Sequence, residues 1–566
     1  MTERFDVEDR DWPARAWIMA AIGAVGGLIV HLLTDRAGDY GTPFPIWRQA
    51  ATAFTVIATV SFLLTVELRR WTWSIAFALG WGAVIALIGW FTAQYNQVPD
   101  IFEFPFLSGI LAVLIAAPLF QTVRDEGAWA FPYARLHRHA WTDAVIGAAS
   151  LAFTGVTFLL AWLIASLFVV IGIDAIKDLL KEDWFSWMLA GLAFGGALGI
   201  LRERDALVAT MQKLVMVVFA VLAPVLAVAL AAFLLSLPFT GLKGLWESDI
   251  PATPMLLLAG AGAILLVNAV IGDGRDERSP NSWLQRAALV LLVCILPLGI
   301  LAGMSMGERI NQYGWTPERI WGVVAVATAV AYGLAAWWAV YKGRKEFDDP
   351  LRPLQTQLAI GLSVLALFLA LPIVDFGAIS ARSQLARLDS GKVKAEEFDW
   401  TAMAFDFGPE GRERLANIAK SGAANLRSLA KTALDSENRY ALSQDTEKAA
   451  QQSRLDQYLR VQSPDIAVSD ELKAEVTGYD GCNDRPCALL RLDAGHLLLV
   501  YKPYDSGLVQ SRVIDLAKLG KTERRSPEVR AAASNKVDLA KAALEVRPVQ
   551  RRQLYVDGQP VGDPFE

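Results

Sequence analysis

Charged residues are nearly absent from eleven long stretches within the first 375 residues of this sequence. The whole chain is 54% hydrophobic and 20% charged, and it contains 19 Trp. Soluble proteins of this length seldom have such a composition. Since about 20 residues at a rise of 1.5 Å cross a hydrocarbon core of ~30 Å, these stretches are long enough to span a bilayer. The composition therefore argues against an ordinary soluble protein.

The uncharged stretches predict an all-α polytopic transmembrane helix bundle of about 11 spans. The longest, Ala144–Ile171, fits either one tilted helix or a kinked one. The full set is Trp17–Leu33, Gln49–Val66, Trp73–Phe91, Phe104–Phe120, Ala144–Ile171, Trp184–Leu201, Leu214–Leu237, Met255–Ile271, Ala287–Met304, Ile320–Tyr341 and Leu358–Val374.

The sequence also lacks the motifs of several enzyme classes. It has no Walker loop, nucleophile elbow, zinc-protease helix or kinase signature, and we expect no catalytic motif, cofactor or metal. The glycines Gly191, Gly195 and Gly199 lie inside an uncharged stretch and follow no strand. Their spacing, shared by Gly23 and Gly27, is typical of close helix packing. We expect packing within the bundle, with a dimer interface as the alternative.

We expect no cleavable signal peptide, because Met1–Trp12 is acidic and polar, and no lipidation. With a cytoplasmic N-terminus, the cytoplasmic connections hold more than twice as many lysines and arginines as the opposite ones. This asymmetry follows the positive-inside rule. An odd number of spans then places the C-terminal domain outside the cytoplasm. Because the basic residues are dispersed over short connections, nucleic-acid binding is disfavoured.

Few ionisable groups lie inside the uncharged stretches. Glu67 and His31 lie near stretch ends, and Asn268 lies inside one. A coupled transporter usually needs more such groups near the midplane, which disfavours transport. The basic segment from Arg135 to His139 predicts contact with anionic lipid headgroups, and a metal site formed by its two histidines is the alternative.

Only three cysteines occur in the chain. Cys294 lies inside a span and is predicted to be a packing residue. Cys482 and Cys487 flank a turn-forming segment with Asn, Asp and Pro, which a disulfide would close in an oxidising compartment. Two unpaired thiols, or a metal site with His496 as a third ligand, are the alternatives.

After Val374 the composition becomes that of a soluble domain. We predict two domains: residues 1–375 form the bundle, and residues 376–566 form an extracytoplasmic (periplasmic) α+β domain. This domain is long enough to bury its own core. The expected elements are helices at Gly411–Leu434, Asp445–Leu459 and Lys536–Leu544, two strands within 488–501 around a turn at Asp493–Gly495, and a hairpin at 552–561 with an Asp-Gly turn.

The densest polar segment connects the ninth and tenth stretches. Thr316 is predicted to cap the next helix, with Pro317 in the first helical position and Glu318 at the positive helix end. Capping does not account for the other polar residues of this connection. In the predicted topology they face the same side as polar residues after the last span, which suggests a polar outer patch. Solvated loops that only orient the helices are the alternative. The patch comprises Glu308, Arg309, Asn311, Gln312, Tyr313, Trp315, Asp375, Ser380, Arg382, Ser383 and Gln384.

Three segments carry a family resemblance: Arg309–Trp321, Ile379–Leu388 and Phe398–Gly411. On these segments the chain resembles the bacterial domain-of-unknown-function family 4153, whose members are polytopic membrane proteins. The resemblance extends over nearly the whole chain and implies a bacterial cytoplasmic (inner) membrane. It implies no catalytic residue, and the cysteine pair is not part of it.

Three functions are compatible with this sequence. The favoured hypothesis is a non-enzymatic membrane protein of the cell envelope that binds a partner protein, a lipid or another envelope component through its outer domain and polar patch. The second is a transporter or lipid carrier that uses the bundle, with a polar cavity lined by Asn268 or similar groups. The third is an envelope transferase with Glu308, Asp375 or Asp399 as a base.

Overall fold

The computed structural model divides into two compact units, each described separately below. The membrane unit comprises Met1–Gln384 and Phe405–Gly411, and the C-terminal unit comprises Leu385–Ala404 and Arg412–Glu566. The residues that the structure describes are 12–35, 44–95, 104–242, 251–436, 438–463, 466–477, 481–482, 485–502, 510–519, 552–556 and 559–565.

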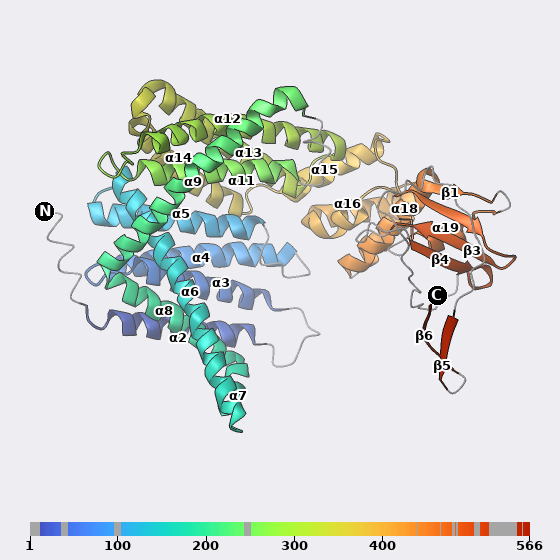
Figure 1. The fold of residues 1–566 in the computed structure, drawn as a ribbon, viewed down its shortest axis with the longest axis horizontal. Coiled ribbons are helices and arrows are strands. Elements are labelled where there is room, and N and C mark those ends of the chain that lie inside the picture. Colours follow the sequence, from blue (N-terminus) through green and yellow to red (C-terminus); the bar gives the residue numbers. More distant parts are fainter. Residues whose placement is uncertain are drawn as a thin grey trace. The chain divides into compact units, whose positions relative to one another are not determined.

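The membrane unit is entirely helical in its described residues (Figure 1). Eleven of its helices are long and apolar enough to cross a membrane, which confirms the predicted bundle. They are α2 (Arg15–Thr34), α3 (Ile46–Thr65), α4 (Trp71–Tyr95), α5 (Phe104–Glu126), α6 (Tyr133–Val170), α8 (Asp183–Arg202), α9 (Asp205–Thr240), α11 (Ala252–Ile271), α12 (Ser282–Tyr313), α13 (Pro317–Gly343) and α14 (Asp348–Ala370).

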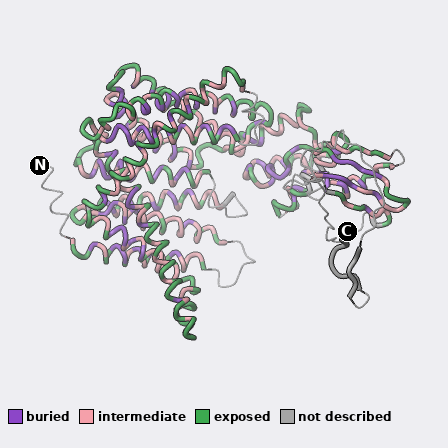
Figure 2. Tube along the Cα trace, in the orientation of Figure 1, coloured by how far each residue is buried: buried purple, intermediate pink, exposed green. Residues whose placement is uncertain are grey.

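Helix α6 is the longest element of the bundle. It is a single helix of 38 residues, so the stretch Ala144–Ile171 belongs to one continuous span. The short α7 (Ala175–Lys181) follows it and is mostly exposed. The second half of α6 is largely exposed as well (Figure 2). Across the unit, neighbouring helices pack in the order α8, α2, α3, α4, α5, α14, α13 and α12, while α6 contacts α5, α8, α9 and α14.

Glycines hold α2 and α8 at close range. A Cβ atom added to Gly23 would lie 2.0 Å from the carbonyl oxygen of Gly191, and one added to Gly195 would lie 2.2 Å from that of Met19. No larger residue fits at these positions without moving the backbone of the partner helix. The predicted glycine packing is therefore confirmed as packing within the bundle.

The C-terminal unit combines helices with a four-stranded sheet of order β1-β2-β3-β4. β1 pairs parallel to β2, and the other neighbours are antiparallel. Helix α15 (Phe376–Asp389), the π-helix η2 (Ala402–Asp406) and helix α16 (Gly408–Ser421) each have residues in both units. The remaining helices and strands are α17 (Ala424–Asp435), α18 (Arg439–Tyr458), β1 (Leu459–Val461), α19 (Asp470–Val476), β2 (Cys487–Arg491), β3 (His496–Tyr501), β4 (Gln510–Asp515), β5 (Arg552–Val556) and β6 (Gln559–Phe565).

Alternating apolar residues build the core of this sheet. Leu489, Leu497 and Leu499 are fully buried, because one face of β2 and β3 packs against α19 and the end of α18. The predicted strands around the turn at residues 493–495 are present. The helix predicted over Gly411–Leu434 is instead two helices, because the chain leaves helical geometry at Gly422 and Ala423.

Three further expectations concern the end of the chain. β5 and β6 form the predicted hairpin, although its Asp-Gly turn lies outside the described residues. The helix expected at Lys536–Leu544 also lies outside them. The structure joins Cys482 to Cys487 by a disulfide with a Cα–Cα distance of 5.7 Å.

Candidate functional site

The predicted polar patch centres on the tight turn between α12 and α13. Gly314 ends α12 with a φ of +77°, a conformation that glycine adopts without strain. Two side chains of α15 bind the turn: the Trp315 N–H donates to Ser383 Oγ at 3.2 Å, and Gln384 Nε2 donates to the Tyr313 carbonyl at 2.9 Å. Four patch residues thus meet in a fastened turn.

The start of α13 is capped as the sequence predicts. Thr316 Oγ1 accepts a hydrogen bond from the Arg319 N–H at 3.4 Å, and Pro317 occupies the first helical turn. The Arg319 guanidinium also donates to the Gly314 carbonyl at 2.7 Å and lies over the Tyr313 ring at 5.3 Å. Orientation of α13 therefore accounts for much of the polarity of this segment.

Two other patch residues serve α15 itself. Asp375 Oδ1 accepts from the Ala378 N–H at 2.8 Å and so caps the helix. Ser380 is fully buried and donates to the Phe376 carbonyl at 2.7 Å. The remaining patch residues are exposed: Glu308, Arg309, Asn311, Gln312 and Arg382.

Exposed charges of α12 and α15 lie close along the chain to the residues that fasten the turn. Arg309 lies one helical turn before Tyr313, so both share a face of α12. Arg382 directly precedes Ser383, whose hydroxyl holds the turn. This end of the bundle, called the turn end below, thus combines a fixed backbone with exposed charges that an external anion or dipole can contact.

A second polar site, which sequence reasoning missed, occupies the first three turns of α6. Tyr133 donates to Asn268 Oδ1 at 3.3 Å, and Arg138 pairs with Asp273 at 3.2 Å. His139 Nε2 lies 2.9 Å from the Asp125 carboxylate. We call the polar residues of this segment the α6 hub: Tyr133, Arg135, His137, Arg138, His139 and Asp143.

The hub reaches helices on both sides of α6. Asp143, five residues further along α6 than Arg138, accepts a hydrogen bond from Gln121 Nε2 at 2.9 Å. Arg135 pairs with Glu126 at 3.1 Å, and the buried His137 bonds with Tyr133 at 3.1 Å. The segment predicted to meet lipid headgroups therefore pairs with protein groups, although Arg138 keeps 68% of its side chain exposed. The described residues contain no group of three side chains suited to hold a metal ion.

Buried arginines continue the network around the end of α3. Arg124 pairs with Glu67 and Asp125 while donating to the Thr65 carbonyl, and its side chain is 3% exposed. Arg202 donates to the Val66 carbonyl at 2.9 Å. The last carbonyls of a helix lack intrahelical donors and form its negative end. These arginines supply both the missing donors and the compensating charge.

On the other side of α6, Asp348 is the most deeply buried charge. Arg278 and Arg352 each approach its carboxylate to 2.9 Å. Arg352 also donates to the Ile271 carbonyl at 2.9 Å, and so ties α14 to the end of α11. Charged groups from α5, α6, α8 and α14 and from the connections that follow α3 and α11 thus lie at one end of the bundle, called the hub end below.

Two groups in the connection between α11 and α12 have shifted pKa values. Burial raises the pKa of Glu277, and the neighbouring Asp273 carboxylate raises it further. A hydrogen bond from Arg275 to Asp349 raises the pKa of the Arg275 guanidinium. The shift at Arg275 reflects a favourable pair with Asp349, whereas the shift at Glu277 disfavours its charged form beside Asp273.

Sequence signals for the hub existed but were weak. Asp143 directly precedes the uncharged stretch that begins at Ala144, and Asp348 and Arg352 are four residues apart at the start of α14. Residues at this spacing share a helix face. Nothing in the sequence indicates that Arg278 completes the second pair across 70 residues.

These features define a polytopic membrane protein, with apolar helices spanning the bilayer and charged groups paired where the helices end. Within that class the chain belongs to the DUF4153 family, a domain of unknown function whose model matches residues 47–417. This range contains the turn end and nearly all of the hub end. No curated protein and no solved structure has significant similarity to the chain.

Proposed function

We propose that this protein is a non-enzymatic protein of the bacterial cytoplasmic (inner) membrane that binds an envelope protein or lipid through its periplasmic side. The observation that carries the proposal is the turn end. There the backbone is fastened by Ser383 and Gln384, while Glu308, Arg309 and Arg382 remain exposed. A rigid backbone that presents exposed charges loses little freedom on binding a partner.

The orientation follows from the charge asymmetry. The hub end is rich in arginine, and positive residues concentrate on the cytoplasmic side of such proteins. The turn end and the C-terminal unit then face the periplasm, where a Cys482–Cys487 disulfide persists. A C-terminal alkaline phosphatase fusion should be active, and a C-terminal green fluorescent protein fusion dark. The reverse pattern, or two freely alkylated thiols in fresh membranes, would refute this orientation.

The binding role is tested by purification from native membranes. The double variant Arg309→Ala/Arg382→Ala should reach wild-type abundance but lose a co-purifying protein or lipid that mass spectrometry detects with the wild type. The matched control is Lys342→Ala/Lys345→Ala, which removes two exposed cations near the opposite end. If both double variants lost the co-purifying molecule equally, or if neither lost it, a role for the turn end would be refuted.

A transporter or lipid carrier is the second candidate, and Asp143 favours it. Its carboxylate lies inside α6 and bonds with Gln121 of α5. Acids within membrane segments commonly mark proton or ion routes. Asn268, in contrast, lies in the last turn of α11 and bonds with Tyr133. Proton flux in proteoliposomes that Asp143→Asn abolishes would favour transport over the first proposal.

A further inference from the structure

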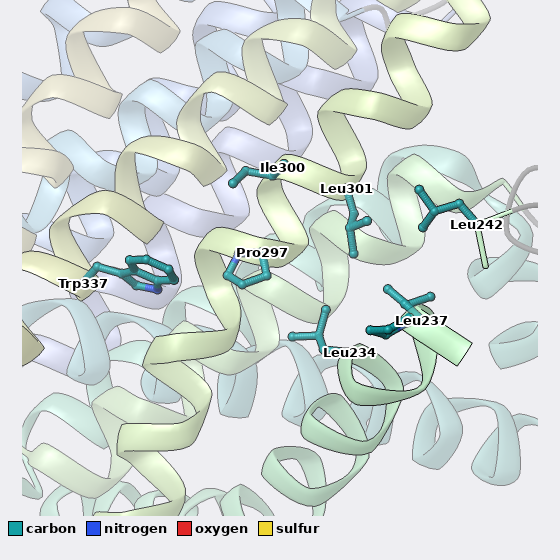
Figure 3. Close-up of a pocket in the computed structure, with 8 residues that line it drawn as sticks. Leu234, Leu237, Leu242, Pro297, Ile300, Leu301 and Trp337 are labelled. Atoms are coloured by element: carbon teal, nitrogen blue, oxygen red, sulfur yellow. The ribbon is translucent and has the colours of Figure 1, made fainter. Parts of the chain in front are cut away.

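An apolar groove lies between α9, α12 and α13 (Figure 3). Leu234 and Leu237 border it from α9, Ile300 and Leu301 from α12, and Trp337 from α13. Its volume is about 580 Å³, which is within the ~300–1,000 Å³ typical of small-molecule sites. No charged side chain lines it.

A proline and a tryptophan define one wall of this groove. Pro297 has no N–H, so the carbonyl of Val293 in α12 loses its usual helical donor. Trp337 Nε1 donates to that carbonyl at 3.0 Å. Unsatisfied backbone groups are costly in hydrocarbon. The bond therefore stabilises α12 and also holds the indole ring at the edge of the groove.

The groove lies within the depth of the spans. Thr253 at the start of α11 bonds with Ser305 of α12 at 3.0 Å, so α11 begins level with Ser305. Ile300 and Leu301 lie one turn further from the end of α12 at Tyr313. Ile300 is 50% exposed and Trp337 is 45% exposed. The groove thus opens on the surface of the bundle where the surrounding medium is hydrocarbon.

We propose that this groove binds one acyl chain of a membrane glycerophospholipid. An extended peptide is excluded as an occupant, because its polar backbone would find no partners among these side chains. A helix of a second copy fits poorly, since helix interfaces in membranes favour small residues and this groove is lined by leucines and an indole. An acyl chain has no polar groups to satisfy and does not need small residues beside it. It also makes the dispersion contacts that an empty groove lacks.

Photo-crosslinking of the full chain in lipid nanodiscs tests the assignment. The probe is a phosphatidylethanolamine with a diazirine in one acyl chain, and labelled peptides are mapped by mass spectrometry. Label should concentrate in peptides of α9, α12 and α13 around Leu237, Ile300 and Trp337. Leu301→Trp should fill the groove and remove most of that label. Ile300→Trp is a second blocking variant, at a half-exposed position where a larger side chain meets less strain.

The matched control is Leu151→Trp, the same change on the exposed face of α6, where Leu151 is 65% exposed. It should leave the label around Ile300 unchanged. Label spread evenly over the exposed faces, α6 included, would indicate ordinary bilayer contact and overturn the proposal. Label that persists in a folded Ile300→Trp variant would overturn it as well, whatever the fate of Leu301→Trp.

Discussion

Different kinds of interaction stabilise the two ends of the membrane unit. At the hub end, buried side chains of opposite charge pair with each other, as Asp348 does with Arg352 one turn along α14 and with Arg278 from the connection between α11 and α12. At the turn end, side chains such as Ser383 and Gln384 bond with backbone groups. Removing one member of a buried ion pair leaves an uncompensated charge, whereas a lost side chain–backbone bond leaves only a polar group that water can reach. The hub end should therefore be far more sensitive to single substitutions.

The largest effect is expected at Asp348. Asp348→Ala leaves two arginine side chains without their buried partner, so it should lower the free energy of unfolding by about 3–5 kcal/mol. The comparison is Arg275→Ala, because the Arg275 side chain is 70% exposed and its partner Asp349 also pairs with Arg352. That change should cost less than about 1 kcal/mol. Thermal unfolding in detergent measures both, and equal losses would contradict the distinction between buried and exposed pairs.

An intermediate effect is expected between the two ends, at Trp337. Trp337→Phe removes the donor to the Val293 carbonyl and should cost about 1–3 kcal/mol. In a Pro297→Ala background the backbone N–H returns to the helix, so the second change should cost much less. Thermal unfolding of the four variants measures this coupling. Additive losses would show that the indole contributes only packing.

A smaller effect is expected at the turn end itself. Thr316→Ala removes the α13 cap and should cost about 1 kcal/mol. Arg309→Ala should leave stability nearly unchanged, because isolated exposed charges contribute little. The same unfolding assay measures both variants. If Arg309→Ala lowered stability as much as Thr316→Ala, Arg309 would have a structural role. The basis for its proposed binding role would then be removed.

The smallest effect is expected in the C-terminal unit, at Asp493. Hydrogen bonds from the Gly495 N–H and the His496 ring lower the pKa of its carboxyl. A lowered pKa stabilises the fold above the ordinary Asp value of ~3.9, and this contribution is lost as pH falls through the lower native pKa. Hydrogen exchange measures the protection of the β2 and β3 amides in the wild type and in Asp493→Asn at each pH. The wild type should be better protected near neutral pH, and its advantage over the variant should shrink in acid. Asp470→Asn on α19 is the control, and an identical acid response would contradict the assignment.

The local sequence pattern was enough to predict the membrane spans, the close packing of glycines and the start of one helix. Uncharged stretches located the spans, glycine spacing predicted close packing within the bundle, and Thr316 and Pro317 located the start of α13. The break after Ser421 was missed, because the apolar periodicity continues through Gly422 into α17.

The hub was missed because its partners are distant along the chain. Tyr133 and Asn268 are 135 positions apart, as are Arg138 and Asp273. From the sequence, Arg138 was predicted to contact lipid headgroups, and Asn268 was placed inside a span as a possible cavity-lining group. The fold brings the start of α6 next to the end of α11 and the connection that follows it. Long-range pairing of this kind cannot be inferred from periodicity in one sequence.

The length of α6 connects the hub to the thickness of the bilayer. At a rise of 1.5 Å the apolar part of α6, from Ala144 to Val170, extends about 40 Å, beyond a hydrocarbon core of ~30 Å. A helix of excess length adapts by tilting, and it tilts further in a thinner membrane. Its hub end is tied to α5 through His139 and to the end of α11 through Arg138 and Tyr133. A change in the tilt of α6 would therefore strain these hydrogen bonds and ion pairs. In this way the thickness of the membrane would affect the charged end of the bundle.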